Sequence, residues 1–118
     1  WNIVVSHHPW YSNNKNYECS EELDNLFNKM NNTGKIDLFI SGYDYTQQHI
    51  YIPKKPNIII SGVGSCSKNL PIIKIYKEIK YISNKLGCCM IDFTKTKLVV
   101  SFYNIYKKRE YNFSVHKV

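Results

Sequence analysis

The feature that most constrains this fold is that the apolar residues come in short runs, each stopped by a glycine, a proline or a polar turn. Runs of this length between turn signals favour β-strands over helices. None approaches the roughly 18 residues that a membrane-spanning helix needs. The pattern predicts strands at residues 1–6, at residues 36–40, around Ile50 and Ile52 before Pro53, and at residues 57–61.

Two segments show helical spacing instead. Residues 20–31 predict a helix with acidic residues in its first turn and Gly34 after its end, because apolar residues recur at i, i+3, i+4 and i+7: Leu23, Leu26, Phe27 and Met30. Residues 71–86 predict a second helix, with Gly87 as its C-cap. Its apolar stripe is Ile72, Tyr76, Ile79 and Leu86, and its solvent-facing side carries Lys74, Lys77, Lys80 and Lys85.

The last third of the chain predicts an antiparallel meander. Alternating apolar runs at residues 88–93, 98–103 and 111–116 are joined by polar turns. A chain of 118 residues has room for one small domain. An early helical connection followed by late hairpins predicts a mixed α/β layout.

The chain is basic, with a net charge of +7 from 16 basic and 9 acidic residues, but Arg109 is its only arginine. Nucleic-acid readers usually rely on arginine for bidentate contacts to bases and phosphates. A balance made almost entirely of lysine fits a diffuse positive field that attracts phosphate groups or acidic partners. Nucleic-acid binding is therefore the least favoured class of function, and we expect no nucleic-acid partner.

Two strand ends carry side chains suited to chemistry. His7 and His8 follow the first predicted strand, and Tyr43-Asp44-Tyr45 follows the strand at residues 36–40. A histidine at a strand end is a natural metal ligand, because the sheet fixes its Cβ atom. A hydrogen-bonded structural histidine is, however, the commoner outcome for such a residue taken alone.

The order of the motifs resembles the C-terminal half of the metallophosphoesterases (calcineurin-like phosphoesterases), in the purple (tartrate-resistant) acid phosphatase branch. The matching segments are His-His-Pro-Trp-Tyr-Ser at residues 7–12, Ser-Gly-Tyr-Asp-Tyr at residues 41–45, and Ser-Gly-Val-Gly-Ser at residues 61–65. The resemblance implies a hydrolase family and an α/β fold that forms half of a four-layer αββα sandwich. Residues 1–118 would be the C-terminal part of one such domain. It covers nearly the whole chain and is weakest at residues 65–85.

The resemblance also implies two metal ions, iron with zinc, manganese or a second iron, that clamp a phosphate monoester and activate water. Part of that ligand set comes from an N-terminal half whose motifs are absent from this sequence. The chain opens with Trp1 and has no initiator methionine, so we expect it to begin within a longer protein. The missing N-terminal half is therefore an expected partner.

The sequence departs from the family pattern at the metal ligands. His7 matches one ligand, but Tyr43 and Tyr45 stand where Gly-His-Asp-His would place two histidines, and the loop at residues 13–16 lacks the family's histidine. A phenol binds a divalent metal only if it loses its proton, although ferric iron can remove it, so Tyr45 remains a possible ligand. Two interpretations follow: a degenerate scaffold or binding protein, as in known degenerate relatives of this branch, or an acid phosphatase that is active with its N-terminal half.

The cysteines show no zinc-binding spacing. The resemblance implies that Cys19 is bridged to the absent N-terminal half, so we expect it to be a free thiol in this chain. Cys66 is a candidate partner for either Cys88 or Cys89. The family is secreted or lumenal, and sequons at Asn31 and Asn112 permit glycosylation. We therefore expect an extracytoplasmic location, whether secreted, lumenal or membrane-associated.

Overall fold

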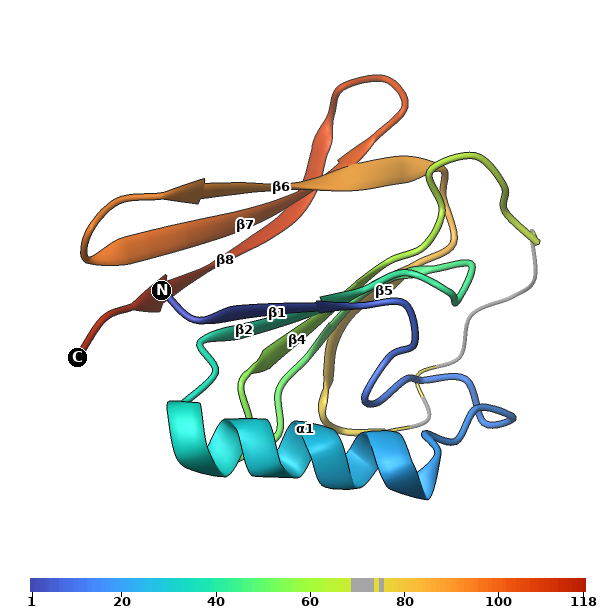
Figure 1. The fold of residues 1–118 in the computed structure, drawn as a ribbon. Coiled ribbons are helices and arrows are strands. Elements are labelled where there is room, and N and C mark those ends of the chain that lie inside the picture. Colours follow the sequence, from blue (N-terminus) through green and yellow to red (C-terminus); the bar gives the residue numbers. More distant parts are fainter. Residues whose placement is uncertain (69–73, 75) are drawn as a thin grey trace.

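The computed structural model describes residues 1–68, 74 and 76–118, in which one helix and two sheets form three layers (Figure 1). The helix lies on one face of a five-stranded sheet, and a three-stranded sheet lies on the other. In chain order the elements are β1 (Ile3–Ser6), α1 (Glu21–Gly34), β2 (Leu38–Ser41), β3 (Gln47–Ile50), β4 (Asn57–Ser61), β5 (Ile79–Ser83), β6 (Gly87–Phe93), β7 (Lys97–Asn104) and β8 (Arg109–His116).

The larger sheet is mixed and has the strand order β1-β2-β4-β3-β5. β1, β2 and β4 are parallel neighbours, whereas β3 pairs antiparallel with both β4 and β5. A parallel pair needs a crossover connection, and α1 provides it between β1 and β2. The carboxyl ends of β1, β2 and β4 therefore meet at one edge of the sheet.

β2 and β4 supply side chains to two cores, one on each face of the sheet. Phe39, Ile58 and Ile60 pack on the helix side, while Leu38 and Ile59 face the three-stranded sheet. All five side chains are fully buried. Strands covered on both faces read as continuous apolar runs, which is why these two were predictable from the sequence.

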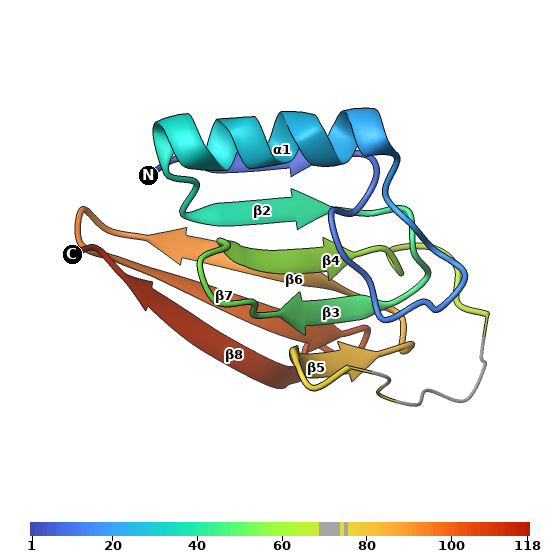
Figure 2. The same ribbon diagram turned by 90° about the horizontal axis from the view of Figure 1, so that it is seen from below.

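Helix α1 forms where its spacing predicted and extends to Gly34. Ser20 is the N-cap, and its hydroxyl accepts a hydrogen bond from the Leu23 amide at 3.3 Å. Acidic residues in the first turn favour the positive end of the helix dipole. Phe27 anchors the helix in the core, with its ring 4.8 Å from that of Phe39, so the helix runs along the β1–β2 side of the sheet (Figure 2).

The predicted meander is confirmed as the antiparallel sheet β6-β7-β8. Its central strand places Leu98, Val100 and Phe102 against the larger sheet, and all three are fully buried. The molecule is thus a mixed α/β domain, as the sequence predicted. In the part of the chain that the structure describes, no helix is long and apolar enough to cross a membrane.

The predicted helix at residues 71–86 is wrong where the structure describes it. Ile79–Ser83 is strand β5, and Gly87 opens β6 instead of capping a helix; residues 71–73 and 75 lie outside the described residues. The cause is a bulge in the β3–β5 pairing that skips Lys80. It puts Ile79 and Ile82 on the same core although they are three residues apart, a spacing that imitates a helix.

A buried histidine joins the two sheets. His49 on β3 is 5% exposed, and its ring stacks on Phe113 of β8 with centroids 3.6 Å apart. Its Nδ1 atom lies 2.8 Å from the Tyr111 hydroxyl and its Nε2 atom 2.8 Å from Asn57 Oδ1. Both contacts are satisfied by the neutral ring, with Nε2–H as donor and Nδ1 as acceptor.

We predict that His49 makes the fold sensitive to acid. Burial lowers the pKa of His49. The hydrogen bond to Asn57 raises it in part, and the nearby charge of Lys80 lowers it further. The contribution of the neutral His49 ring to the free energy of unfolding is fully present above about pH 6.5, the pKa of histidine in the unfolded chain. It is lost as the pH falls from there through the lower folded pKa, because the unfolded chain then binds a proton that the folded chain does not. Each unit of pKa difference corresponds to about 1.4 kcal/mol.

Urea unfolding at about pH 7.5 and about pH 5 tests this pH dependence. His49→Gln should flatten the dependence, whereas the same change at the exposed His116 should leave it unaltered. An equal loss of stability in acid for both variants would show that another group is responsible.

Candidate functional site

The candidate site is the rim formed by the loops that follow β1, β2 and β4. His7 and His8 come directly after β1, and residues 42–46 follow β2. The third loop, residues 62–64, follows β4. Because the three strands are parallel, all of these loops emerge at the same edge. This is the edge where ligands bind in open α/β sheets.

Four rings gather at the rim. The His7 and Tyr43 ring centroids are 5.5 Å apart, those of His8 and Tyr43 are 4.8 Å apart, and the two imidazoles lie 4.7 Å from each other. Tyr17, from the loop before α1, joins them with its ring 5.7 Å from that of Tyr43. The structure thus brings together His7, His8 and Tyr43 from the two predicted strand ends, and adds Tyr17, which the sequence motifs did not single out.

The two rim tyrosines differ in their surroundings. Tyr43 is half exposed and has a φ of 70°, a left-handed conformation that is uncommon for any residue other than glycine. Tyr45 is also exposed, and its ring lies 4.8 Å from the Lys68 ammonium rather than in the four-ring group. The two rim tyrosines therefore point into separate environments.

Tyr17 is held as a neutral hydrogen-bond donor. Burial, followed by the nearby Cys19 thiol and Asp44 carboxyl, raises the pKa of Tyr17 above its ordinary value. Its hydroxyl donates to the Pro9 carbonyl. This bond ties the loop after β1 to the segment that leads into α1.

Asp44 lies between the two tyrosines, but its side chain is buried and fully engaged. The Ser12 hydroxyl donates to Asp44 Oδ2, and the Asn14 amide nitrogen donates to Oδ1 at 3.2 Å. A buried carboxylate is tolerated only when it is hydrogen-bonded in this way. Asp44 therefore joins the β2 loop to the β1 loop. The only sign of this role in the sequence is the presence of an Asp in the middle of the Tyr-Asp-Tyr motif.

Gln48 completes this connection from β3. Its amide nitrogen donates to Thr46 Oγ1 at 2.8 Å and to Ser12 Oγ at 3.3 Å, and its carbonyl oxygen accepts from the Asn13 backbone amide at 2.9 Å. Gln48 is 1% exposed. The sequence predicted a strand around Ile50 and Ile52, whereas β3 ends at Ile50 and begins at Gln47, so Gln48 gave no signal of this function.

The rim of this chain does not fit a two-metal centre by itself. Among residues 1–68, 74 and 76–118, no three His, Cys, Asp or Glu side chains are placed to hold a metal ion. The available donors are two imidazoles and exposed phenols, and Asp44 is occupied by Ser12 and Asn14. Two metal ions of this set need more oxygen and nitrogen ligands than these residues supply.

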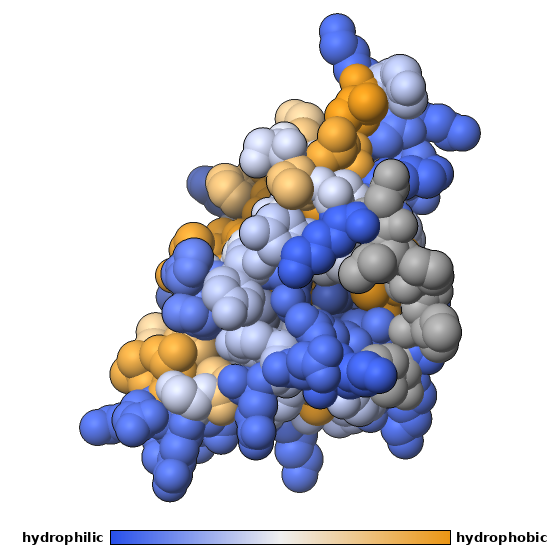
Figure 3. All heavy atoms as spheres, turned by 90° about the vertical axis from the view of Figure 1, so that its right-hand side faces the viewer, coloured by the Kyte–Doolittle hydropathy of each residue, from blue (hydrophilic) through white to orange (hydrophobic). Residues whose placement is uncertain are grey.

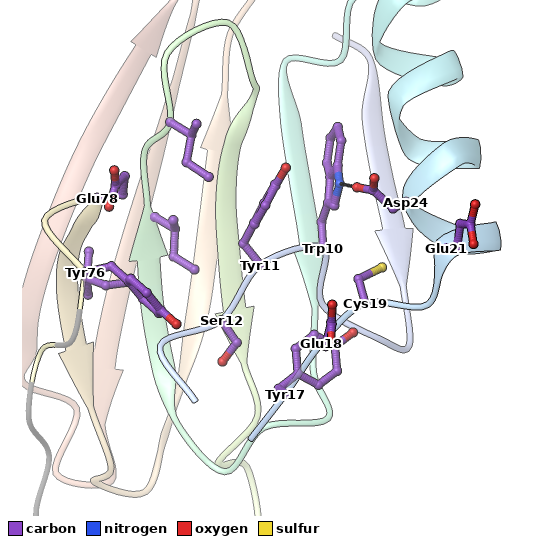
Figure 4. A pocket seen from close by; sticks show the side chains of 13 residues that line it. Trp10, Tyr11, Ser12, Tyr17, Glu18, Cys19, Glu21, Asp24, Tyr76 and Glu78 are labelled. Carbon is purple, nitrogen blue, oxygen red and sulfur yellow. Dashed lines mark hydrogen bonds between the residues drawn. The ribbon is translucent and has the colours of Figure 1, made fainter. Parts of the chain in front are cut away.

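A pocket of about 710 Å³ adjoins the rim on the helix side of the sheet (Figure 4). Tyr17 belongs to both, and Trp10 lines the pocket with its indole nitrogen donating to Asp24 Oδ1 at 2.8 Å. Four acidic side chains line this pocket: Glu18, Glu21, Asp24 and Glu78. Its charge is therefore opposite in sign to that of the chain as a whole.

All four cysteines are free thiols in the structure, so Cys66 is not joined to Cys88 or Cys89. Cys66 and Cys88 are exposed, whereas Cys19 and Cys89 are half-buried. Burial, with the neighbouring Cys88 adding to it, raises the pKa of Cys89 to about 12. Burial and then the charge of Asp24 raise the pKa of Cys19.

Comparison with known proteins relates this fold to the phosphoesterases. The chain is 28% identical over 107 residues to purple acid phosphatase 4 of Arabidopsis thaliana, a match that covers 89% of this chain and 31% of that protein. The chain thus spans about a third of the length of this curated relative. No protein-family model matches the chain.

Two solved structures share the fold. GAP50, the anchor in the inner membrane complex of Plasmodium, matches with a TM-score of 0.83 and 23% identity over 98% of this chain and 36% of that one. Purple acid phosphatase PPD1 from yellow lupin seeds matches with a TM-score of 0.75 and 15% identity over 98% of this chain and 25% of that one. The chain therefore has the fold of part of a metallophosphoesterase, and its sequence is related to the purple acid phosphatases.

We predict that Gly62 cannot be replaced without loss of stability. A Cβ atom at this position would lie 1.6 Å from the Asp44 carbonyl oxygen, so Gly62→Ala must push the β2 loop away from the β4 loop. We expect a loss of about 3 kcal/mol, as for overpacked sites. The control is Gly64→Ala, where nothing lies within 4 Å, and urea denaturation of both variants gives the comparison. Equal stabilities would contradict the close approach of these loops.

The cysteines should differ in their rates of alkylation in this chain. At about pH 8, iodoacetamide should modify the exposed Cys66 and Cys88 first, while Cys19 and Cys89 react slowly because burial disfavours the thiolate. Peptide mass mapping after timed quenching measures the order. All four should react in denaturant; a bridge from Cys19 to Cys66, Cys88 or Cys89 would contradict both the structure and the resemblance.

Proposed function

We propose that this chain is the C-terminal half of a four-layer metallophosphoesterase sandwich that acts as a phosphatase-like scaffold or binding protein. The observation that supports it most is the rim, where Tyr43 and Tyr45 lie in different environments. The resemblance in sequence places these two tyrosines where the family has two histidines. In this proposal the fold is retained and the rim no longer holds two metals.

The chemistry of the donors supports the loss of hydrolysis. A neutral imidazole binds a divalent metal near pH 7, whereas a phenol with a pKa near 10 must first lose its proton. The phenolate then adds negative charge beside a substrate that is itself an anion. Only ferric iron compensates for that charge, so Tyr45 suits one metal position at most and Tyr43 suits neither.

The loop after β1 is altered as well. The stretch at residues 13–16 contains no histidine to assist the leaving group, and Asn13 is buried with its backbone amide bound to Gln48. The loop is therefore folded down onto the β3 side. Such an arrangement supports binding through a fixed surface more than proton transfer to a substrate.

We propose an extracytoplasmic location and two kinds of partner. The first partner is the N-terminal half of the same domain, which the share of each matched protein covered by this chain supports. The second is a protein held by the scaffold. GAP50, described as an anchor, shares the fold with a TM-score of 0.83, which supports a binding role over a hydrolytic one.

The second candidate is an active acid phosphatase, formed when this chain is joined to its N-terminal half. His7 favours it, because this imidazole is exposed at the end of β1, where the family places a metal ligand. The similarity to purple acid phosphatase 4 is consistent with it. In that case an iron–zinc, iron–manganese or di-iron centre would act on phosphate monoesters.

The two candidates predict different activities for the full-length protein. Altering a group that supports a metal typically costs ~10²-fold in affinity or rate, so two altered ligands should lower phosphomonoester hydrolysis at least ~10⁴-fold below that of an intact relative. Metal analysis and hydrolysis of p-nitrophenyl phosphate measure this. Two bound metals and rapid turnover in the unmodified protein would overturn the scaffold proposal.

Matched variants show whether the tyrosines cause the loss. Tyr43→His with Tyr45→His should raise metal content, and histidine tolerates the left-handed backbone at position 43 better than most residues. Tyr43→Phe with Tyr45→Phe should change neither metal content nor activity. Loss of activity in the phenylalanine pair would identify the phenols as working ligands and favour the phosphatase.

A further inference from the structure

The turn between β7 and β8 presents apolar side chains to solvent at a projecting point of the molecule. Ile105 is 60% exposed and Tyr106 is 82% exposed. Figure 1 shows this turn rising at the top, away from the five-stranded sheet. In Figure 3 the same end carries hydrophobic atoms directly beside strongly hydrophilic ones. We call residues 105–109 the hairpin tip.

The hairpin tip is a turn held in shape by hydrogen bonds. Asn104 Oδ1 accepts hydrogen bonds from the backbone amides of Tyr106 at 2.9 Å and Lys108 at 3.1 Å. The backbone adds a bond from the Lys107 amide to the Asn104 carbonyl at 3.1 Å, and Lys107 takes the left-handed conformation with a φ of 62°. The exposed side chains are thus held out in a defined shape, which lowers the entropy cost of binding.

Positive charge surrounds the apolar pair. Lys107, Lys108 and Arg109 follow directly and are all exposed. The hairpin's single acidic residue, Glu110, accepts from Asn104 Nδ2 at 2.6 Å, lies 3.5 Å from the Lys85 ammonium and also interacts with the charge of Lys108. One carboxylate therefore stands against the three cations of the tip and Lys85, so the tip keeps a net positive charge.

We propose that the hairpin tip docks onto an anionic lipid surface. Ile105 and Tyr106 enter the interfacial region of the bilayer, where aliphatic and amphipathic aromatic side chains are favoured. Lys107, Lys108 and Arg109 then contact anionic headgroups. A protruding turn with two apolar side chains suits a lipid bilayer, because lipids can rearrange around the inserted side chains.

A protein or nucleic-acid partner fits the hairpin tip less well. A stable protein interface buries about 800 Å² on each side, which a two-residue apolar protrusion does not supply. Nucleic acid would pair with the cations and could stack on Tyr106, but it offers nothing to the aliphatic Ile105. Both apolar side chains and all three cations find a counterpart only at a charged membrane surface.

The test is co-sedimentation of the full-length protein with lipid vesicles. We expect binding to vesicles of phosphatidylcholine with phosphatidylserine and much weaker binding to phosphatidylcholine alone. Lys107→Gln with Lys108→Gln should lower the partition coefficient about 25-fold, fivefold for each cation. Ile105→Ser with Tyr106→Ser should lower it by about tenfold or more. At roughly 0.5 M salt the effect of the lysine pair should shrink, because the charges are screened.

The β6–β7 turn at the other end of the same sheet provides the controls. Phe93 there is 58% exposed, and Lys95 and Lys97 flank the turn. Phe93→Ser and the pair Lys95→Gln with Lys97→Gln should leave the partition coefficient within about twofold of the parent. The eight residues of β7 separate the two turns by roughly 26 Å, which exceeds the Debye length of about 8 Å at physiological salt. Unchanged thermal unfolding confirms that each variant is folded.

A local probe keeps the proposal testable if other parts of the full-length protein also bind lipid. A tryptophan introduced as Tyr106→Trp should be quenched by brominated lipid in the anionic vesicles, and one introduced as Phe93→Trp should not. Equal quenching of the two, or equal vesicle binding by the parent and the hairpin-tip variants, would overturn the proposal. So would capture of the hairpin tip by an acidic protein without any vesicle binding.

Discussion

Parallel pairing of β1, β2 and β4 is the constraint on which the rest of this structure depends. Parallel strands need both faces covered, so β2 and β4 carry apolar residues along their length and polar side chains only at their first or last residues. Chemistry is thereby confined to the strand ends. The same pairing sends the loops with His7, Tyr43 and Gly62 to one edge, where they lie side by side.

The polar connections at that edge then fix the shape of the rim. Asp44 is drawn inward by Ser12 and Asn14, and this leaves the residues on either side of it, Tyr43 and Tyr45, turned outward. Gly62 allows the β4 loop to approach the Asp44 backbone so closely that no side chain fits between them. The shape of the rim is thus set by buried polar bonds beneath its exposed rings.

The sequence predicted the fold wherever apolar spacing had a single meaning. The runs in β1, β2 and β4, the 3.6-residue spacing of α1 and the alternation in the meander each fit one element type. It failed at β5, because the bulge at Lys80 gives Ile79 and Ile82 a helical spacing. A bulge depends on the partner strand, so nothing within residues 79–83 reveals it.

The location of the candidate site was predictable from the sequence, but the contacts between its loops were not. The strand ends located His7 and Tyr43, because topology alone decides which edge they share. The parts played by Tyr17, Gln48 and Asp44 depend on contacts between loops distant in sequence, and no periodicity records them. His49 shows the same limit: it sits in a strand of polar appearance, yet its ring holds the two sheets together.

The rim and the β7–β8 hairpin also belong to one end of the molecule. Val63, in the loop after β4, accepts a hydrogen bond from the Gly87 amide at 3.1 Å, and Gly87 pairs with Asn104 at the base of the hairpin tip. Gln47 reaches the Tyr103 carbonyl from β3. Hydrogen bonds thus connect the rim to the hairpin, so a surface that receives the hairpin tip also lies on the side of the molecule where the rim opens. A scaffold with this geometry would present the rim near that surface, where its rings meet only partners that reach the same side.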